Sequence, residues 1–108
     1  MASEREEMIQ EKRRLKAEYR ELFDQVAELL FRHDPQGINY QTNTDEYESE
    51  AQTILPRLRS CHSEDDVLRV VHEEFVRWFG VDDAGTQQQY VNIAKEIWQL
   101  AGDFFVRK

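Results

Sequence analysis

The sequence predicts an all-α fold, a four-helix bundle or an orthogonal array of helices with a long acidic loop between helices 1 and 2. Apolar residues recur at steps of three and four in four segments. No segment alternates apolar and polar residues over a useful length, apart from a short extended piece expected at residues 37–40. The chain of 108 residues fits a single helical domain, residues 1–108.

The first helix is predicted over residues 3–33. Its apolar stripe consists of Leu15, Tyr19, Leu22, Phe23, Val26, Leu29 and Leu30. The preceding part, residues 1–14, is nearly devoid of apolar residues, so we expect it to project beyond the core, to fray, or to pack on a second chain. Asp34 and Pro35 end the helix, because proline donates no N–H and disfavours helical geometry in the residue before it.

The second helix is predicted over residues 49–59. Ser49 and Gln52 have the spacing of a capping box, which satisfies free backbone N–H groups at a helix start. Pro56 lies inside this segment, where proline costs about 3 kcal/mol in a helix interior. We therefore expect a kink in the helix, or a break before Pro56.

Of the four predicted helices, the third has the clearest boundaries. Ser63 and Asp66 form the capping box of the third, and Gly80 stands where a C-terminal glycine belongs. The fourth starts near Thr86. The large aromatic residues of these two segments are predicted to fill the core: Phe75, Trp78, Phe79, Trp98, Phe104 and Phe105. We expect the two helices to form an antiparallel hairpin with the first helix across it.

The charge balance limits the kinds of partner that we expect the protein to bind. The chain has 14 basic and 22 acidic residues and a net charge of −8. A nucleic-acid-binding module normally has a basic face, so the prediction is a protein partner, preferably a basic one, and no nucleic acid. The single cysteine, Cys61, favours a reducing compartment. No signal peptide and no apolar run of ~20 residues occurs, which predicts a cytoplasmic protein without membrane contact.

The connection over residues 34–50 is unusually long, acidic and rich in turn-forming residues. Connections inside compact domains usually span about 4–6 residues, and longer ones are often functional. We therefore place the candidate partner-binding site here. Its predicted residues are Asp34, Asp45, Glu46, Tyr47, Glu48 and Glu50.

The same carboxylates suggest an alternative, a metal-binding protein or a metal-dependent enzyme. Asp34, Asp45 and Glu48 could combine with His33, since hard cations prefer several oxygen ligands. Aligned on a calcium-binding EF-hand loop, however, the chain has Thr44 where glycine is required. Our main prediction therefore contains no metal, no cofactor and no catalytic residue.

A set of short motifs resembles a family of small bacterial helical proteins of unknown function. The set comprises DPxGI from Asp34, DEY from Asp45, ILPRL from Ile54 and EFVRWFG from Glu74. It spans about half of the chain. The resemblance implies a helical fold and a bacterial source, and it brings no catalytic residues.

The chain combines a high negative charge and a long loop with no arrangement of residues suited to acid–base catalysis. The main prediction is therefore a non-enzymatic protein-interaction module. One specific version is an inhibitor or immunity-type protein that covers the basic active site of a toxin or nuclease, an analogy of size and charge only. The second candidate function is the metal site described above. A third is purely structural, with the first helix pairing two chains as a homodimer.

Overall fold

The computed structural model describes residues 4–19, 21–35 and 47–106. Within these ranges the chain is helical and the predicted all-α class is confirmed. The elements are α1 (Glu4–Tyr19), α2 (Glu21–His33), α3 (Glu48–Ile54), the 3₁₀ helix η1 (Leu55–Ser60), α4 (Glu64–Ala84), the 3₁₀ helix η2 (Gln87–Tyr90) and α5 (Val91–Val106). The described ranges contain no strand, and the extended piece expected at residues 37–40 lies outside them.

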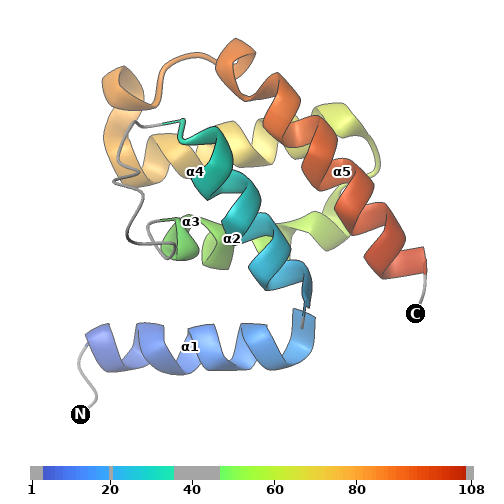
Figure 1. Cartoon of the computed structure of the whole chain (residues 1–108). Coiled ribbons are helices and arrows are strands. Elements are labelled where there is room, and N and C mark those ends of the chain that lie inside the picture. Colours follow the sequence, from blue (N-terminus) through green and yellow to red (C-terminus); the bar gives the residue numbers. More distant parts are fainter. Residues whose placement is uncertain (1–3, 20, 36–46, 107–108) are drawn as a thin grey trace.

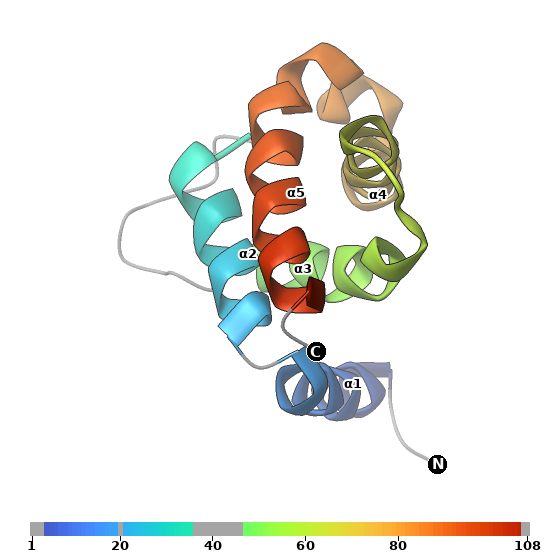
Figure 2. The same ribbon diagram turned by 90° about the vertical axis from the view of Figure 1, so that its right-hand side faces the viewer.

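The helices form an orthogonal array rather than a regular bundle. Figure 2 views α4 along its axis while α5 runs across the picture, so the two cross steeply. The expected antiparallel hairpin is therefore wrong, although α4 and α5 do pack together and α2 packs against α5. Helix α1 lies across one end of the molecule, set off from the others in Figures 1 and 2.

The predicted first helix is two helices in the structure. Helix α1 ends at Tyr19 and α2 begins at Glu21, and the two run in clearly different directions (Figure 1). The predicted end is confirmed, because α2 stops at His33. Asp34 follows with a positive φ of 48°, and its N–H donates to the Leu30 carbonyl at 2.8 Å. This bond satisfies one of the carbonyls left free at a helix end.

The break expected before Pro56 is present. The chain changes from α-helix to 3₁₀ helix at Leu55, which places Pro56 in the first turn of η1. At that position the missing N–H of proline costs little, because the first N–H groups of a helix have no helical partner. The predicted Ser49 cap is wrong: α3 begins at Glu48, and Tyr47 precedes it without a side-chain capping bond.

The predicted start of α4 is confirmed, whereas its predicted end at Gly80 is an interruption, because the helix continues to Ala84. The Ser63 hydroxyl accepts from the Asp66 N–H at 3.1 Å. Gly80 has φ 86° and ψ 163°, which interrupts α4 and separates a short last turn ending at Ala84. Glycine is the residue that adopts this conformation without strain.

The core is shared by all the helices, but it differs from the predicted one at Trp78. Phe75 is fully buried, whereas Trp78 remains 37% exposed and its indole Nε1 donates to Thr53 Oγ1 at 3.0 Å. The other four aromatic residues named above pack against the core while only partly buried. Tyr47 and Tyr90 are also fully buried.

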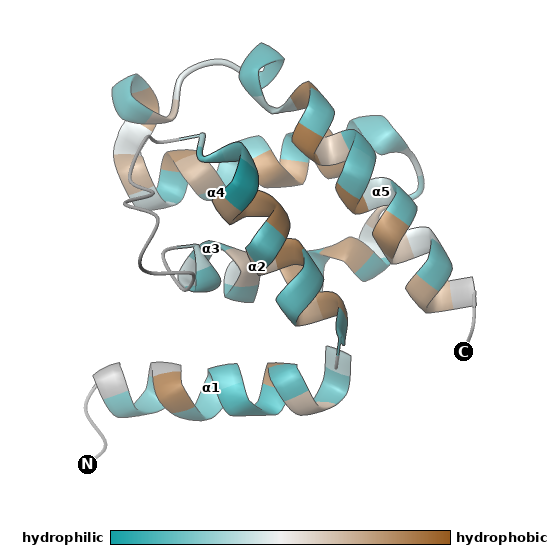
Figure 3. Cartoon of the chain, viewed as in Figure 1, coloured by the Kyte–Doolittle hydropathy of each residue, from teal (hydrophilic) through white to brown (hydrophobic). Residues whose placement is uncertain are grey.

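Helix α1 differs from the rest in hydropathy. Figure 3 shows it as mostly hydrophilic, and Leu15 and Tyr19 are its buried apolar residues among those described. No helix in the described ranges combines the length and the apolar character that a bilayer crossing would require.

Candidate functional site

Two of the predicted partner-binding residues are buried in the structure. Tyr47 has no exposed surface and Glu50 is 4% exposed. Their expected role as surface contacts is therefore wrong. Glu48 and Asp34 are half-buried, while Asp45 and Glu46 lie outside the described residues.

The burial of Tyr47 has a clear structural reason. Its hydroxyl donates to Asp34 Oδ1 at 2.7 Å, and its ring centroid lies 6.1 Å from that of Phe75. Tyr47 therefore links the end of α2 to the start of α3 through an apolar body with a polar tip. The two ends of the predicted loop are structural for this reason, rather than open to a partner.

The described members of the alternative metal site do not come together. His33 Nε2 donates to the Glu96 carboxylate on α5, and Asp34 accepts from Tyr47. Glu48 forms an ion pair with Lys12 of α1. Among the residues that the structure describes, no three His, Cys, Asp or Glu side chains are grouped to hold a metal ion. Asp45 lies outside those residues.

An acidic hollow of about 520 Å³ opens on the outer face of α2. Helix α2 lies at the front of the molecule in Figure 1 and at its left edge in Figure 2, so the other helices leave one side of it uncovered. The hollow is lined by Glu21, Asp24, Gln25, Ala27, Glu28, Phe31 and Glu48. Four of these seven side chains are carboxylates, and Phe31 adds an aromatic surface.

The sequence of α2 explains why the carboxylates gather there. Glu21, Asp24 and Glu28 are spaced by three and four residues, which places them on one side of a helix. The opposite side is buried through Leu22, Phe23, Val26, Leu29 and Leu30. Burial of that apolar stripe fixes the rotation of α2 about its axis. The three carboxylates must therefore face outward together.

These three carboxylates carry uncompensated charge. Within the described part of the chain, none of them forms an ion pair or a hydrogen bond, and no lysine or arginine lines the hollow. Like charges three or four residues apart destabilise a helix by about 0.2–0.5 kcal/mol per pair. Glu21 and Asp24 also lie in the first turn of α2, where the helix dipole favours negative charge. A cation placed in the hollow would relieve the repulsion among the three carboxylates.

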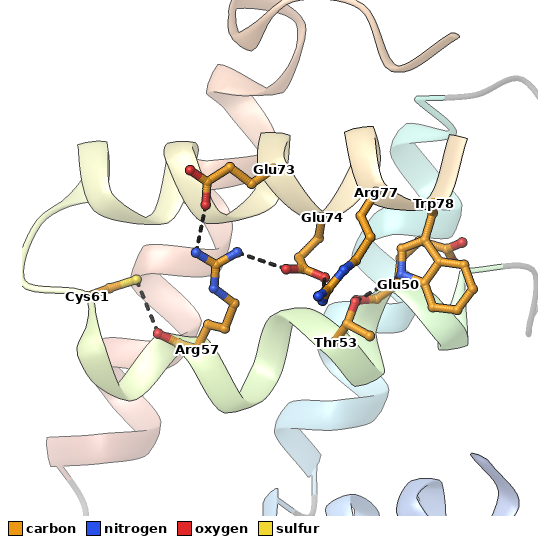
Figure 4. A network of polar contacts seen from close by, with 8 residues as sticks. All are labelled: Glu50, Thr53, Arg57, Cys61, Glu73, Glu74, Arg77 and Trp78. Atoms are coloured by element: carbon orange, nitrogen blue, oxygen red, sulfur yellow. Dashed lines mark hydrogen bonds and ion pairs between the residues drawn. The ribbon is translucent and has the colours of Figure 1, made fainter. Parts of the chain in front are cut away.

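Other carboxylates of the protein are paired and serve the fold. Figure 4 shows Arg57 of η1 between two glutamates of α4, donating to Glu73 at 2.7 Å and to Glu74 at 2.8 Å. The bond from Arg57 holds the pKa of Glu73 below its usual range. In the same way, bonds from His33 and then Arg32 lower the pKa of Glu96. These pairs join helices, which the carboxylates of α2 do not.

Sequence reasoning placed the site on the loop and missed the face of α2. The signal was present, since the spacing of Glu21, Asp24 and Glu28 follows from the same periodicity as the apolar stripe. Such spacing is usual for a solvated helix surface. Phe31 follows from the same spacing, three residues after Glu28, whereas the position of Glu48 beside these carboxylates could be known only from the fold.

Comparison with protein-family models, with curated proteins and with solved structures gives no match for this chain. The resemblance to a family of small bacterial helical proteins stays a prediction.

Proposed function

We propose that this protein is a non-enzymatic interaction module whose acidic hollow receives a basic surface of a protein partner. The observation that supports the proposal best is the row Glu21, Asp24 and Glu28, unpaired within the described chain and facing outward beside Phe31. A lysine or arginine side chain fits this setting, because its cationic end would meet carboxylates on an exposed helix face.

The net charge of −8 also favours a basic partner. A field of one sign draws a basic partner toward the protein and raises the association rate. Inhibition of a basic toxin or nuclease is the version of this function that such a surface suits, since the hollow would then cover a cationic active site. This version extends the proposal by chemical complementarity alone.

The test compares two variants that each remove two exposed negative charges. Asp24→Asn with Glu28→Gln removes two of the four carboxylates of the hollow, and Asp82→Asn with Asp83→Asn removes both carboxylates from the last turn of α4. Each variant and the wild type serve as bait in a lysate of the source cells. We expect a basic protein to be retained by the wild type and by the α4 variant, and to be lost from the hollow variant.

Association rates measured with the purified protein and its partner then show how large the effect of the two substitutions is. At low ionic strength the hollow variant should associate about 3- to 10-fold more slowly than the wild type, and the difference should shrink in salt. Equal rates for the two variants would contradict the proposal, and so would a retained partner that is acidic.

A further inference from the structure

The sequence gives no local reason for the change of direction between α1 and α2. Neither glycine nor proline occurs between Glu4 and His33, and the apolar stripe continues across the junction from Leu15 and Tyr19 to Leu22. Helices usually bend sharply at proline, at glycine or at an inserted group. The contacts of α1 with the rest of the molecule must therefore hold it in its present direction.

Those contacts are mostly electrostatic and are made with later parts of the chain. Lys12 pairs with Glu48 of α3, and Glu18 pairs with Arg59 of η1 at 3.0 Å. The Arg59 guanidinium also lies 5.6 Å from the ring centroid of Tyr19.

The apolar part of the contact is small. Leu15 and Tyr19 are the buried apolar side chains of the described α1, and the Tyr19 ring lies 6.1 Å from that of Phe104 on α5. Exposed ion pairs contribute at most about 1 kcal/mol each. Helix α1 is thus held by a limited set of specific contacts with α3, η1 and α5, together with the Lys16 ammonium over the Phe23 ring of α2.

We propose that two copies of this chain exchange α1. In the exchanged dimer, α1 and α2 form one continuous helix, and α1 of each copy occupies the site on α3, η1 and α5 of the other. The contacts of α1 with α3, η1 and α5 are kept, with Lys12 on Glu48 and Glu18 on Arg59 now formed between chains. The dimer also regains backbone hydrogen bonds that the separate helix ends lack.

The partner is a second copy because the site is complementary to α1 itself. A straight α1 of 16 residues would extend ~24 Å from α2 and would expose Leu15 and Tyr19 to water. The site vacated by α1 in the second copy buries these same two side chains. Exchange keeps the contacts of α1 with α3, η1 and α5 but costs association entropy, so the fraction of dimer should increase with protein concentration.

The experiment uses full-length chains that each hold one thiol. In both chains Cys61→Ser removes the native thiol; one then carries Lys12→Cys and the other Glu48→Cys. Neither chain can link these two positions within itself. The two are unfolded together, refolded at high concentration and treated with a short bismaleimide. We expect a covalent heterodimer on a denaturing gel, with a yield that rises with concentration.

The matched control carries Arg13→Cys in place of Lys12→Cys. Arg13 is the adjacent residue, is exposed, and makes no described contact with Glu48. Its yield should be at least several-fold lower. A second pair, Glu18→Cys with Arg59→Cys, repeats the test on η1, and circular dichroism verifies that each chain folds. Sedimentation of the wild type as a strict monomer at the highest soluble concentration would overturn the proposal. Equal yields for the Lys12 and Arg13 chains would also overturn it.

Discussion

At the scale of single residues, the ion pairs divide into those that support the fold and those that cover its surface. Glu74 is nearly fully buried, and its carboxylate accepts from Arg57 at 2.8 Å and from Arg77 at 3.5 Å. Arg57 is 38% exposed and Arg77 73% exposed. A buried carboxylate depends on its partner, because removing that partner leaves an uncompensated charge in the interior.

Arg57→Met should therefore destabilise the protein strongly. We expect the free energy of unfolding to fall by about 3 kcal/mol, since Glu74 would keep only its longer contact to Arg77. Urea denaturation followed by circular dichroism measures the change. Arg77→Met is the control and should cost under about 1 kcal/mol, as exposed pairs do. Similar losses in both variants would show that the burial of Glu74 does not depend on Arg57.

At the scale of helices, capping and breaking signals determined the boundaries that the sequence predicted correctly. The Ser63 cap, the stop at Asp34 and the change of geometry at Leu55 each follow from a local requirement of backbone hydrogen bonding. The Ser49 cap failed because Tyr47, held by Asp34 and the core, starts α3 one residue earlier. Local signals hold wherever no distant contact competes with them.

Two glycines in helical segments should respond in opposite ways to alanine. A Cβ atom at Gly80 or at Gly102 would meet no atom within 4 Å, so neither substitution causes a clash. Gly80 has φ 86°, a conformation that costs an L-residue about 1–3 kcal/mol. Gly102 lies inside α5, where alanine is favoured by about 0.5–1 kcal/mol.

Thermal and urea unfolding of the two variants measures this contrast. Gly80→Ala should lower the stability, and Gly102→Ala should raise it. A Gly80→Ala protein as stable as the wild type would show that α4 can continue through this position as a regular helix.

At the scale of the whole molecule, ion pairs between helices link stability to acid pH. Hydrogen bonds from Arg57 and from His33 lower the pKa of Glu73 and of Glu96 from the ordinary value of 4.5. Between the lowered and the ordinary value, the unfolded chain binds more protons than the folded one. The stabilisation by these pairs is therefore complete above pH 4.5 and is lost as the pH falls through the folded-state pKa values.

Glu96→Gln should make the protein less sensitive to acid. The variant should be less stable than the wild type at pH 7, and the difference between them should shrink at an acid pH well below 4.5, where the wild-type carboxyl takes up a proton. Urea midpoints at the two pH values provide the measurement. A difference that is independent of pH would mean that the Glu96 charge does not contribute to the contact between α2 and α5.

The core shows where hydrophobic periodicity predicts burial correctly and where it does not. Phe75 and Trp78 are three residues apart on the same helix, and the pattern predicted both as core. The structure buries Phe75 against Tyr47, Phe79 and Tyr90, but leaves Trp78 at the rim with its indole bonded to Thr53. Periodicity identifies the face that turns inward, while the extent of the neighbouring helices decides where that face meets water.

The helical class, several helix ends and the acidic character follow from the amino-acid sequence, because hydrophobic spacing, caps and charge act over a few residues. The steep crossing of α4 and α5, the separate direction of α1, and the burial of Tyr47 and Glu50 come from the folded arrangement instead. The position of Glu48 beside the carboxylates of α2 comes from that arrangement too. These features depend on contacts between distant segments, and the energies of such contacts depend on a geometry that no local pattern contains.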